Sequence, residues 1–190
     1  MRNLCVVAGL ALLASNALAA DFGVGISVRS DDGWLYVPVN VAKSLRIEPS
    51  VRYSSAETTL TQSGTDNRQK NDILELGVGV FGLKQVTEAA HIYYGGRLSY
   101  VDMTSSGTDV TSLGTVIRSQ SDQDGYRIGP TLGFEYLFGG QFSVGGEASY
   151  TFLELEGKAR SRVGNLSSST ADFDQSSQGT QTRLIFRYMF

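Results

Sequence analysis

The sequence has few of the residues on which most enzymes and metal proteins depend. It contains 1 cysteine and 1 histidine in 190 residues. Cys5 lies near the N-terminus, in a segment predicted below to be removed, so the remaining chain forms no disulfide, thiolate metal site or cysteine nucleophile. Histidine-based catalysis would have to use His91. We therefore predict no catalytic residues, no metal site and no cofactor.

Long apolar runs and proline are also scarce. After residue 14, no stretch approaches the 18 consecutive apolar residues of a membrane-spanning helix. Proline occurs 3 times, whereas there are 22 glycines, 9 tyrosines and 9 phenylalanines. The formal net charge of −3 gives no reason to expect nucleic-acid binding. This composition favours β-strands joined by glycine-containing turns.

The N-terminus has the three parts of a secretory signal peptide. A short basic start with Arg2 precedes an apolar run from Leu4 to Ala14, and Ala-Leu-Ala follows at 17–19. This order predicts cleavage after an A-x-A site. We therefore expect a signal peptide over 1–19 and one exported domain over 20–190.

Eight segments alternate apolar and polar residues with the period of two that is typical of β-strands. Most are near the ten residues that a tilted transmembrane strand needs. They are 22–29, 34–41, 45–54, 72–83, 91–103, 126–138, 142–153 and 181–190.

The connections between these segments differ in length. Those at 42–44, 84–90 and 139–141 are short, as is the first one at 30–33. The other three are long and rich in Ser, Thr, Gly, Asp and Gln: 54–71, 104–125 and 154–180. An even number of strands with tight turns on one side and longer loops on the other is typical of an outer-membrane barrel. The pattern places both termini and the tight turns in the periplasm, and three polar loops outside the cell.

The two faces of the segments predict which side meets lipid. One face is almost uncharged, as in Leu74, Leu76, Val78 and Val80, whereas the opposite face carries arginine and glutamate. A soluble barrel would bury the uncharged face. Here tyrosines and phenylalanines gather at both ends of that face, as in the two aromatic girdles of a membrane barrel. We therefore predict that the uncharged face contacts lipid.

The last segment, RLIFRYMF, ends on an aromatic residue. Its lipid-facing row is Leu184, Phe186, Tyr188 and Phe190. An exported chain with eight alternating segments and such an ending resembles the small outer-membrane β-barrels, the OmpA-transmembrane-domain and OmpX-like group. The resemblance covers the whole exported chain in architecture, without a specific motif. It implies an all-β, eight-stranded antiparallel up-and-down transmembrane β-barrel, integral to the outer membrane of a Gram-negative bacterium, whose terminal row is read by the barrel-assembly machinery.

The inward face predicts a closed interior. An eight-stranded barrel has a lumen that side chains can fill. Because buried charges must be paired, we expect a salt-bridge network that plugs the lumen, with inward glycines making room for it. A gated ion path would use the same charges. The ten predicted members are Arg46, Glu48, Arg52, Glu75, Arg97, Arg127, Glu135, Glu147, Arg183 and Arg187.

Three other patterns have simpler explanations than the sites that they resemble. Residues 77–82 read G-x-G-x-x-G, but the strand alternation runs through them, whereas a dinucleotide site needs a helix there. Asp122 to Gly125 resembles part of a calcium loop but lacks its closing glutamate. His91 is expected at the periplasmic rim. Family enzymes that modify lipid A use a histidine at the outer rim, so an enzyme is disfavoured.

One surface segment suggests a partner. If the strand over 142–153 continues outward, Lys158, Arg160 and Arg162 would stand among lipopolysaccharide phosphates. The alternative is a solvated hairpin arm with weak internal ion pairs. We therefore predict a non-enzymatic barrel with a plugged lumen, in contact with outer-membrane lipid and lipopolysaccharide, that serves envelope structure and presents loops for adhesion or an extracellular ligand. The alternative is transport of small solutes or hydrophobic molecules, through a pore or a lateral opening.

Overall fold

The computed structural model describes residues 21–28, 33–62, 65–111, 114–164 and 168–190. The predicted signal peptide lies outside them. The described residues include no helix that is long and apolar enough to cross a membrane. They form the strands β1 (Asp21–Val28), β2 (Gly33–Tyr36), β3 (Val39–Ala42), β4 (Leu45–Gln62), β5 (Thr65–Gln85), β6 (Ala90–Val110), β7 (Val116–Phe138), β8 (Phe142–Val163) and β9 (Ser168–Met189).

These strands form a closed antiparallel ring with eight positions. Neighbours in sequence pair from β3 to β9, and β1 closes the ring by pairing with β9 from Gly23↔Met189 to Val28↔Leu184. The strands β2 and β3 share one position between β1 and β4. The predicted all-β, up-and-down eight-stranded barrel is therefore confirmed.

The predicted strand at 34–41 is interrupted at Val37 and Pro38 because proline has no N–H to donate to a ladder. The wall nevertheless stays joined there. The N–H of Gly23 donates to the Pro38 carbonyl, and that of Val37 donates to the Pro49 carbonyl, both at 2.9 Å. The break is therefore a kink in one strand and not a lateral opening.

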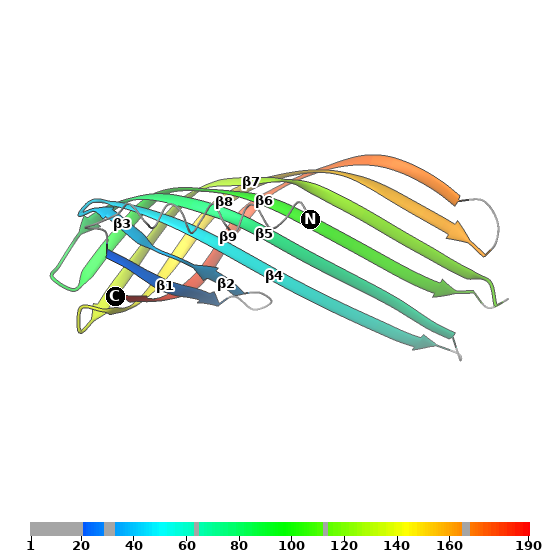
Figure 1. Ribbon diagram of the computed structural model, residues 1–190, viewed down its shortest axis with the longest axis horizontal. Helices are drawn as coiled ribbons and strands as arrows, with labels where there is room; N and C mark the ends of the chain where they lie inside the picture. The colour runs from blue at the N-terminus through cyan, green and yellow to red at the C-terminus, as the bar shows by residue number, and fades with distance from the viewer. Residues whose placement is uncertain (1–20, 29–32, 63–64, 112–113, 165–167) are drawn as a thin grey trace.

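The prediction of three long polar loops is wrong. The strands β4 to β9 continue through those segments as regular ladders of 18 to 23 residues each. We call the parts beyond the apolar belt the outer extension: 55–62, 65–72, 102–110, 116–125, 153–163 and 168–177. In Figure 1 these parts of β4–β9 reach far past the β1–β2 hairpin. The sequence suggested loops because both faces are polar there, which hides the period of two.

The apolar face of the ring points outward. Ile128, Leu132 and Phe134 on β7 are all more than half exposed, and the same holds for Leu184 on β9. Exposed aromatics flank this belt and contact each other at its two ends, for example Phe22–Phe190 at 5.2 Å and Tyr100–Tyr126 at 5.8 Å between ring centroids. Such a surface suits hydrocarbon with an interface on each side.

Candidate functional site

The ten charged residues predicted for the interior all lie in the lumen, which makes the lumen the chemically distinctive part of the molecule. Their side chains are at most 15% exposed. They come from β4 to β9, at the inward positions of each strand. The sequence alternation thus predicted their direction, but not which carboxylate meets which guanidinium.

Each of the four glutamates lies between two arginines. Glu135 contacts Arg46 at 2.7 Å and Arg187 at 2.9 Å. Arg187 continues to Glu48 at 2.8 Å, and Glu48 also contacts Arg97. These contacts form one network that extends from the turn end of the barrel towards its middle.

The network ends on a third carboxylate. Arg97 contacts Glu147 at 2.9 Å, and Arg183 lies 3.4 Å from the same carboxylate. Arg97 and Arg187 therefore each bridge two glutamates. The continuous chain, which we call the lumen network, runs Arg46–Glu135–Arg187–Glu48–Arg97–Glu147–Arg183.

A separate triad lies nearer the outer extension. Glu75 contacts Arg127 at 2.9 Å and Arg52 at 3.3 Å. Both clusters hold one more arginine than glutamate. Together they form two charged layers across a lumen that is already narrow.

Four aromatic side chains fill the space around these charges: Trp34, Tyr36, Phe81 and Tyr93. The Arg97 guanidinium lies over Tyr36 and Phe81, 4.7 and 4.8 Å from the ring centroids. Arg52 and Arg183 approach Trp34 at 5.5 and 5.3 Å, so this ring joins the triad to the lumen network. Such cation–π contacts strengthen when they are desolvated.

Sequence reasoning missed these inward aromatics because it assigned the aromatic residues to the lipid face. The signal was nevertheless present. Tyr93 has the same strand parity as Arg97, and Phe81 has that of Glu75. Both side chains are fully buried, and the Tyr93 hydroxyl donates to Glu147 at 3.2 Å.

Inward glycines make room for the rings. An ideal Cβ at Gly133 would lie 2.1 Å from Cζ of Tyr93, and one at Gly79 would lie 2.4 Å from Cε2 of Phe81. Neither contact is possible for real atoms, so a side chain at either position would displace a ring from the lumen. These glycines therefore determine which rings can lie beside the charges.

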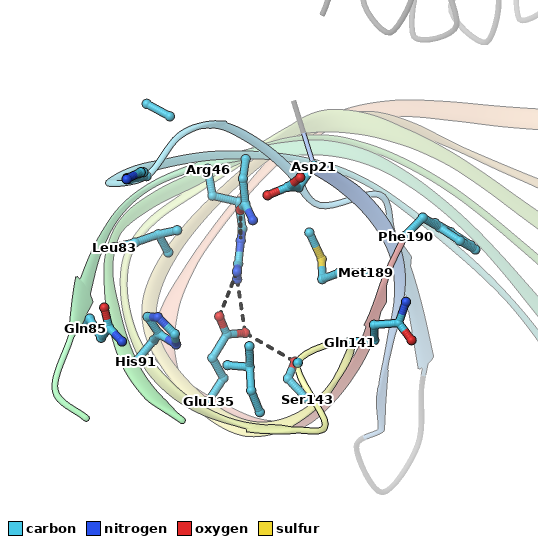
Figure 2. A pocket seen from close by; sticks show the side chains of 15 residues that line it. Asp21, Arg46, Leu83, Gln85, His91, Glu135, Gln141, Ser143, Met189 and Phe190 are labelled. Carbon is cyan, nitrogen blue, oxygen red and sulfur yellow. Dashed lines mark hydrogen bonds and ion pairs between the residues drawn. The ribbon is translucent and has the colours of Figure 1, made fainter. Parts of the chain in front are cut away.

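A cavity of about 850 Å³ opens at the turn end of the barrel. Figure 2 shows Arg46 reaching across it to Glu135, with Ser143 on the same carboxylate. His91 lines the wall, and its buried Nδ1 has no hydrogen-bond partner among the described residues. The Arg46–Glu135 pair lines this cavity and is also the first ion pair of the lumen network.

The other predicted residues lie on the outer surface. Lys158, Arg160 and Arg162 point outward from β8 in the outer extension, where Lys158 lies 4.0 Å from Asp172. The terminal row on β9 faces the lipid side, with Leu184 and Phe190 57% and 64% exposed. None of these side chains joins the lumen network.

The described residues include no group of three or more histidine, cysteine or acidic side chains arranged to hold a metal ion. The G-x-G-x-x-G stretch at 77–82 lies inside β5, with no helix after it, so no phosphate cradle forms there. What the lumen provides is a set of paired, desolvated charges.

Comparison with known proteins gives a likeness in structure alone. No family model matches the chain, and no curated protein sequence matches it. A major outer membrane protein from Thermus thermophilus superposes with a TM-score of 0.60 at 15% identity, over 90% of this chain and all of that chain. Ail, the attachment invasion locus protein of Yersinia pestis, matches with a TM-score of 0.46 at 11% identity, over 90% of this chain and 95% of that one. CarO of Acinetobacter baumannii matches with a TM-score of 0.46 at 10% identity, over 93% of this chain and all of that chain.

Proposed function

We propose that this chain, which has the fold of the outer-membrane β-barrels, is an integral outer-membrane protein that conducts nothing through its lumen and acts through the surface it presents outside the cell. The proposed role is non-enzymatic. Both termini and the tight turns would lie in the periplasm, and the outer extension would stand beyond the lipid. One observation carries the proposal: the lumen network crosses the barrel as an unbroken series of buried ion pairs.

The energetic reason is that these charges cannot separate cheaply. Removing one partner of a buried pair leaves an uncompensated charge and costs roughly 3–5 kcal/mol. Arg97 and Arg187 each hold two carboxylates, so opening a path would break several contacts at once. An eight-stranded barrel has little spare width for water beside them.

Planar-bilayer conductance of the refolded protein tests this role. We expect no single-channel steps from folded wild-type protein. Arg97→Ala removes the side chain that bridges Glu48 and Glu147, so this variant should show small, reproducible steps. Steps of equal size from wild type would reverse the proposal and favour the solute-transport alternative.

A second observation favours the hydrophobic-transport alternative. The lipid-facing wall has a groove of about 870 Å³ over β7, β8 and β9, lined by Leu132, Phe134, Ala148 and Leu184 among others. An apolar molecule could lie in it within the membrane. Uptake of an apolar dye into liposomes that contain the protein, lost in Ala148→Phe, would establish this function.

We also propose that the outer extension contacts lipopolysaccharide through Lys158, Arg160 and Arg162. All three point outward and are exposed, beyond the end of the apolar row at Phe152. Arginine binds phosphate with two parallel hydrogen bonds, which lysine cannot reproduce.

The expected result is that lipopolysaccharide raises the unfolding temperature of the wild-type protein more than that of the Arg160→Ala/Arg162→Ala variant. The Arg160→Lys/Arg162→Lys variant keeps the charge and should be intermediate. Equal stabilisation of all three proteins would mean that these residues form only a solvated arm.

A further inference from the structure

In the part of the chain that the structure describes, the outer extension is a barrel in which two ring positions hold no strand. The ladder between β1 and β9 stops at Leu184, and the ladder between β2 and β4 stops at Val51. Beyond these points β4 to β9 remain paired with one another for many more residues. Within the described residues, nothing occupies the two ring positions between β9 and β4. Figure 1 shows the two edges of this open sheet beyond the short β1–β2 hairpin.

Both edges offer backbone groups to another chain. One side of β4 has no neighbouring strand over 54–60, and one side of β9 has none over 168–182, among the described residues. Natural edge strands are usually protected from pairing by lysine, proline or a bulge. Neither edge contains lysine, arginine or proline, and the charged residues of the two edges are the acids Glu57, Asp172 and Asp174. Both are therefore competent to accept a strand.

The inner face of the outer extension is almost uncharged, in contrast to the lumen below it. Its inward positions carry small hydroxyl, amide and apolar side chains, and Asp109 is the only ionisable one among the described side chains. The outward positions of the same strands carry Glu57, Arg68, Lys70 and many other charges. In a sheet with both faces in water, charged residues can lie on either face. Their confinement to the outward face is typical of a sheet whose other face is covered.

Part of this inner face is already packed. Val101 and Leu155 lie at its base, 0% and 2% exposed. Phe173 covers Gly157, where an ideal Cβ would lie 3.0 Å from its ring. Above this cluster a hollow of about 380 Å³ is lined by small residues such as Ser105, Ser119 and Ala159. On β9 this cluster lies beyond Leu184, where the ladder with β1 stops, so it belongs to the part of the sheet that lacks the two strands.

We propose that a β-hairpin of another protein completes the outer extension by pairing with β4 on one side and β9 on the other. A hairpin fits because no described residue occupies the two adjacent ring positions, and both edges require an antiparallel neighbour. Asp172 and Asp174 are the outward acids of the β9 edge, so the strand beside β9 carries basic outward residues. Its inward residues are small or apolar. This inference rests on the proposed orientation, with the outer extension outside the cell.

The test uses the full chain, refolded in lipid vesicles, and a synthetic hairpin as the probe. The peptide has two strands of about ten residues joined by Asn-Gly, with Thr and Ala facing inward and Lys placed opposite Asp172 and Asp174. Amide hydrogen exchange is followed over 54–60 and 168–182. We expect the peptide to slow exchange at both edges together.

A matched pair of charge variants separates edge pairing from general attraction. Asp172→Lys/Asp174→Lys changes the β9 edge and should weaken peptide binding about tenfold, since two favourable cross-strand charge pairs become repulsive. Asp122→Lys/Asp124→Lys makes the same change on the same face of β7, which has a neighbour on each side. This control should bind within about twofold of wild type.

Four results would overturn the proposal. Absence of protection at both edges would mean that the gap between β4 and β9 accepts no hairpin, and protection of one edge alone would mean that a single strand binds. Equal weakening in both variants would mean attraction by charge alone. Protection that rises with protein concentration without peptide would make the occupant a second copy of this chain. None of these results depends on whether the lumen conducts ions. A failure of the hairpin proposal can therefore be distinguished from a failure of the proposed plug.

Discussion

At the scale of single residues, Arg187 shows how the lumen compensates for the burial of a charged side chain. Its side chain is 1% exposed, contacts Glu48 and Glu135, and lies 5.0 Å from the centroid of Tyr93. Two carboxylates and one ring therefore compensate for its desolvation. The same guanidinium links β9 to β4 and β7 across the lumen.

Arg187→Ala should consequently lower the free energy of unfolding by roughly 3–5 kcal/mol, because both carboxylates lose a partner in a low-dielectric interior. Urea unfolding in lipid vesicles measures this loss. Arg68→Ala is the control, since the Arg68–Glu57 pair is exposed and its loss should leave the unfolding midpoint unchanged. Equal midpoints for the two variants would show that the lumen network contributes nothing to stability.

At the scale of elements, the outer face of the extension brings like charges together. The cross-strand registers place Asp102 opposite Asp124, Asp124 opposite Glu156, and Glu156 opposite Asp174. Like charges directly opposite each other destabilise a sheet. Partial burial, with the Asp124 and Asp122 carboxylates nearby, raises the pKa of Asp102.

A raised carboxyl pKa means that the folded state binds the proton more tightly than the unfolded state. Ionised Asp102 therefore destabilises the extension above its folded pKa, and this penalty is relieved as pH falls through that pKa. We expect Asp102→Asn to slow amide exchange over 100–106 at pH 7. The difference from wild type should shrink as pH falls through the raised pKa of Asp102, because the carboxyl then becomes neutral in both states.

Comparison at each pH cancels the intrinsic pH dependence of exchange. Asp109→Asn serves as the control, because Asp109 pairs with Ile117 and faces no opposing acid. An effect of Asp102→Asn that does not change with pH would assign the difference to packing instead of charge.

At the scale of the whole molecule, the barrel depends on joining its first strand to its last. Phe22 and Phe190 meet at this seam, and the N–H of Phe190 donates to the Phe22 carbonyl at 2.8 Å. Both rings face outward at the turn end, so replacing either one with alanine removes similar contacts. Their positions in the chain differ, and we propose that the terminal strand, which contains Leu184, Phe186 and Tyr188 and leads to Phe190, is the segment read by the barrel-assembly machinery.

Phe190→Ala should therefore slow insertion by the barrel-assembly machinery, whereas Phe22→Ala should not. The folded fraction over time, read from the gel shift of unheated samples, measures the difference. Equal slowing would mean that the seam contact alone matters and that Leu184, Phe186, Tyr188 and Phe190 carry no separate signal.

The sequence by itself determined the barrel and the direction of its faces. The period of two, with one uncharged row, is visible in each segment by itself. It identifies Arg46 and Glu135 as inward residues. Their contact was not predictable, because 89 residues separate them and only ring closure brings β4 opposite β7. The alternation also indicates that Tyr93 points inward. Its contact with Glu147 was not predictable, because it depends on where the fold places β8.

The tertiary structure alone decided the length of the strands and where the ring is incomplete. In 104–125 and 154–180 both faces are polar, so composition resembles that of a loop. Backbone hydrogen bonds between neighbouring strands keep these segments extended, and such bonds leave no trace in side-chain pattern. The open edges of β4 and β9 arise because β1 ends at Val28 and β2 begins at Gly33, so neither strand reaches the outer extension.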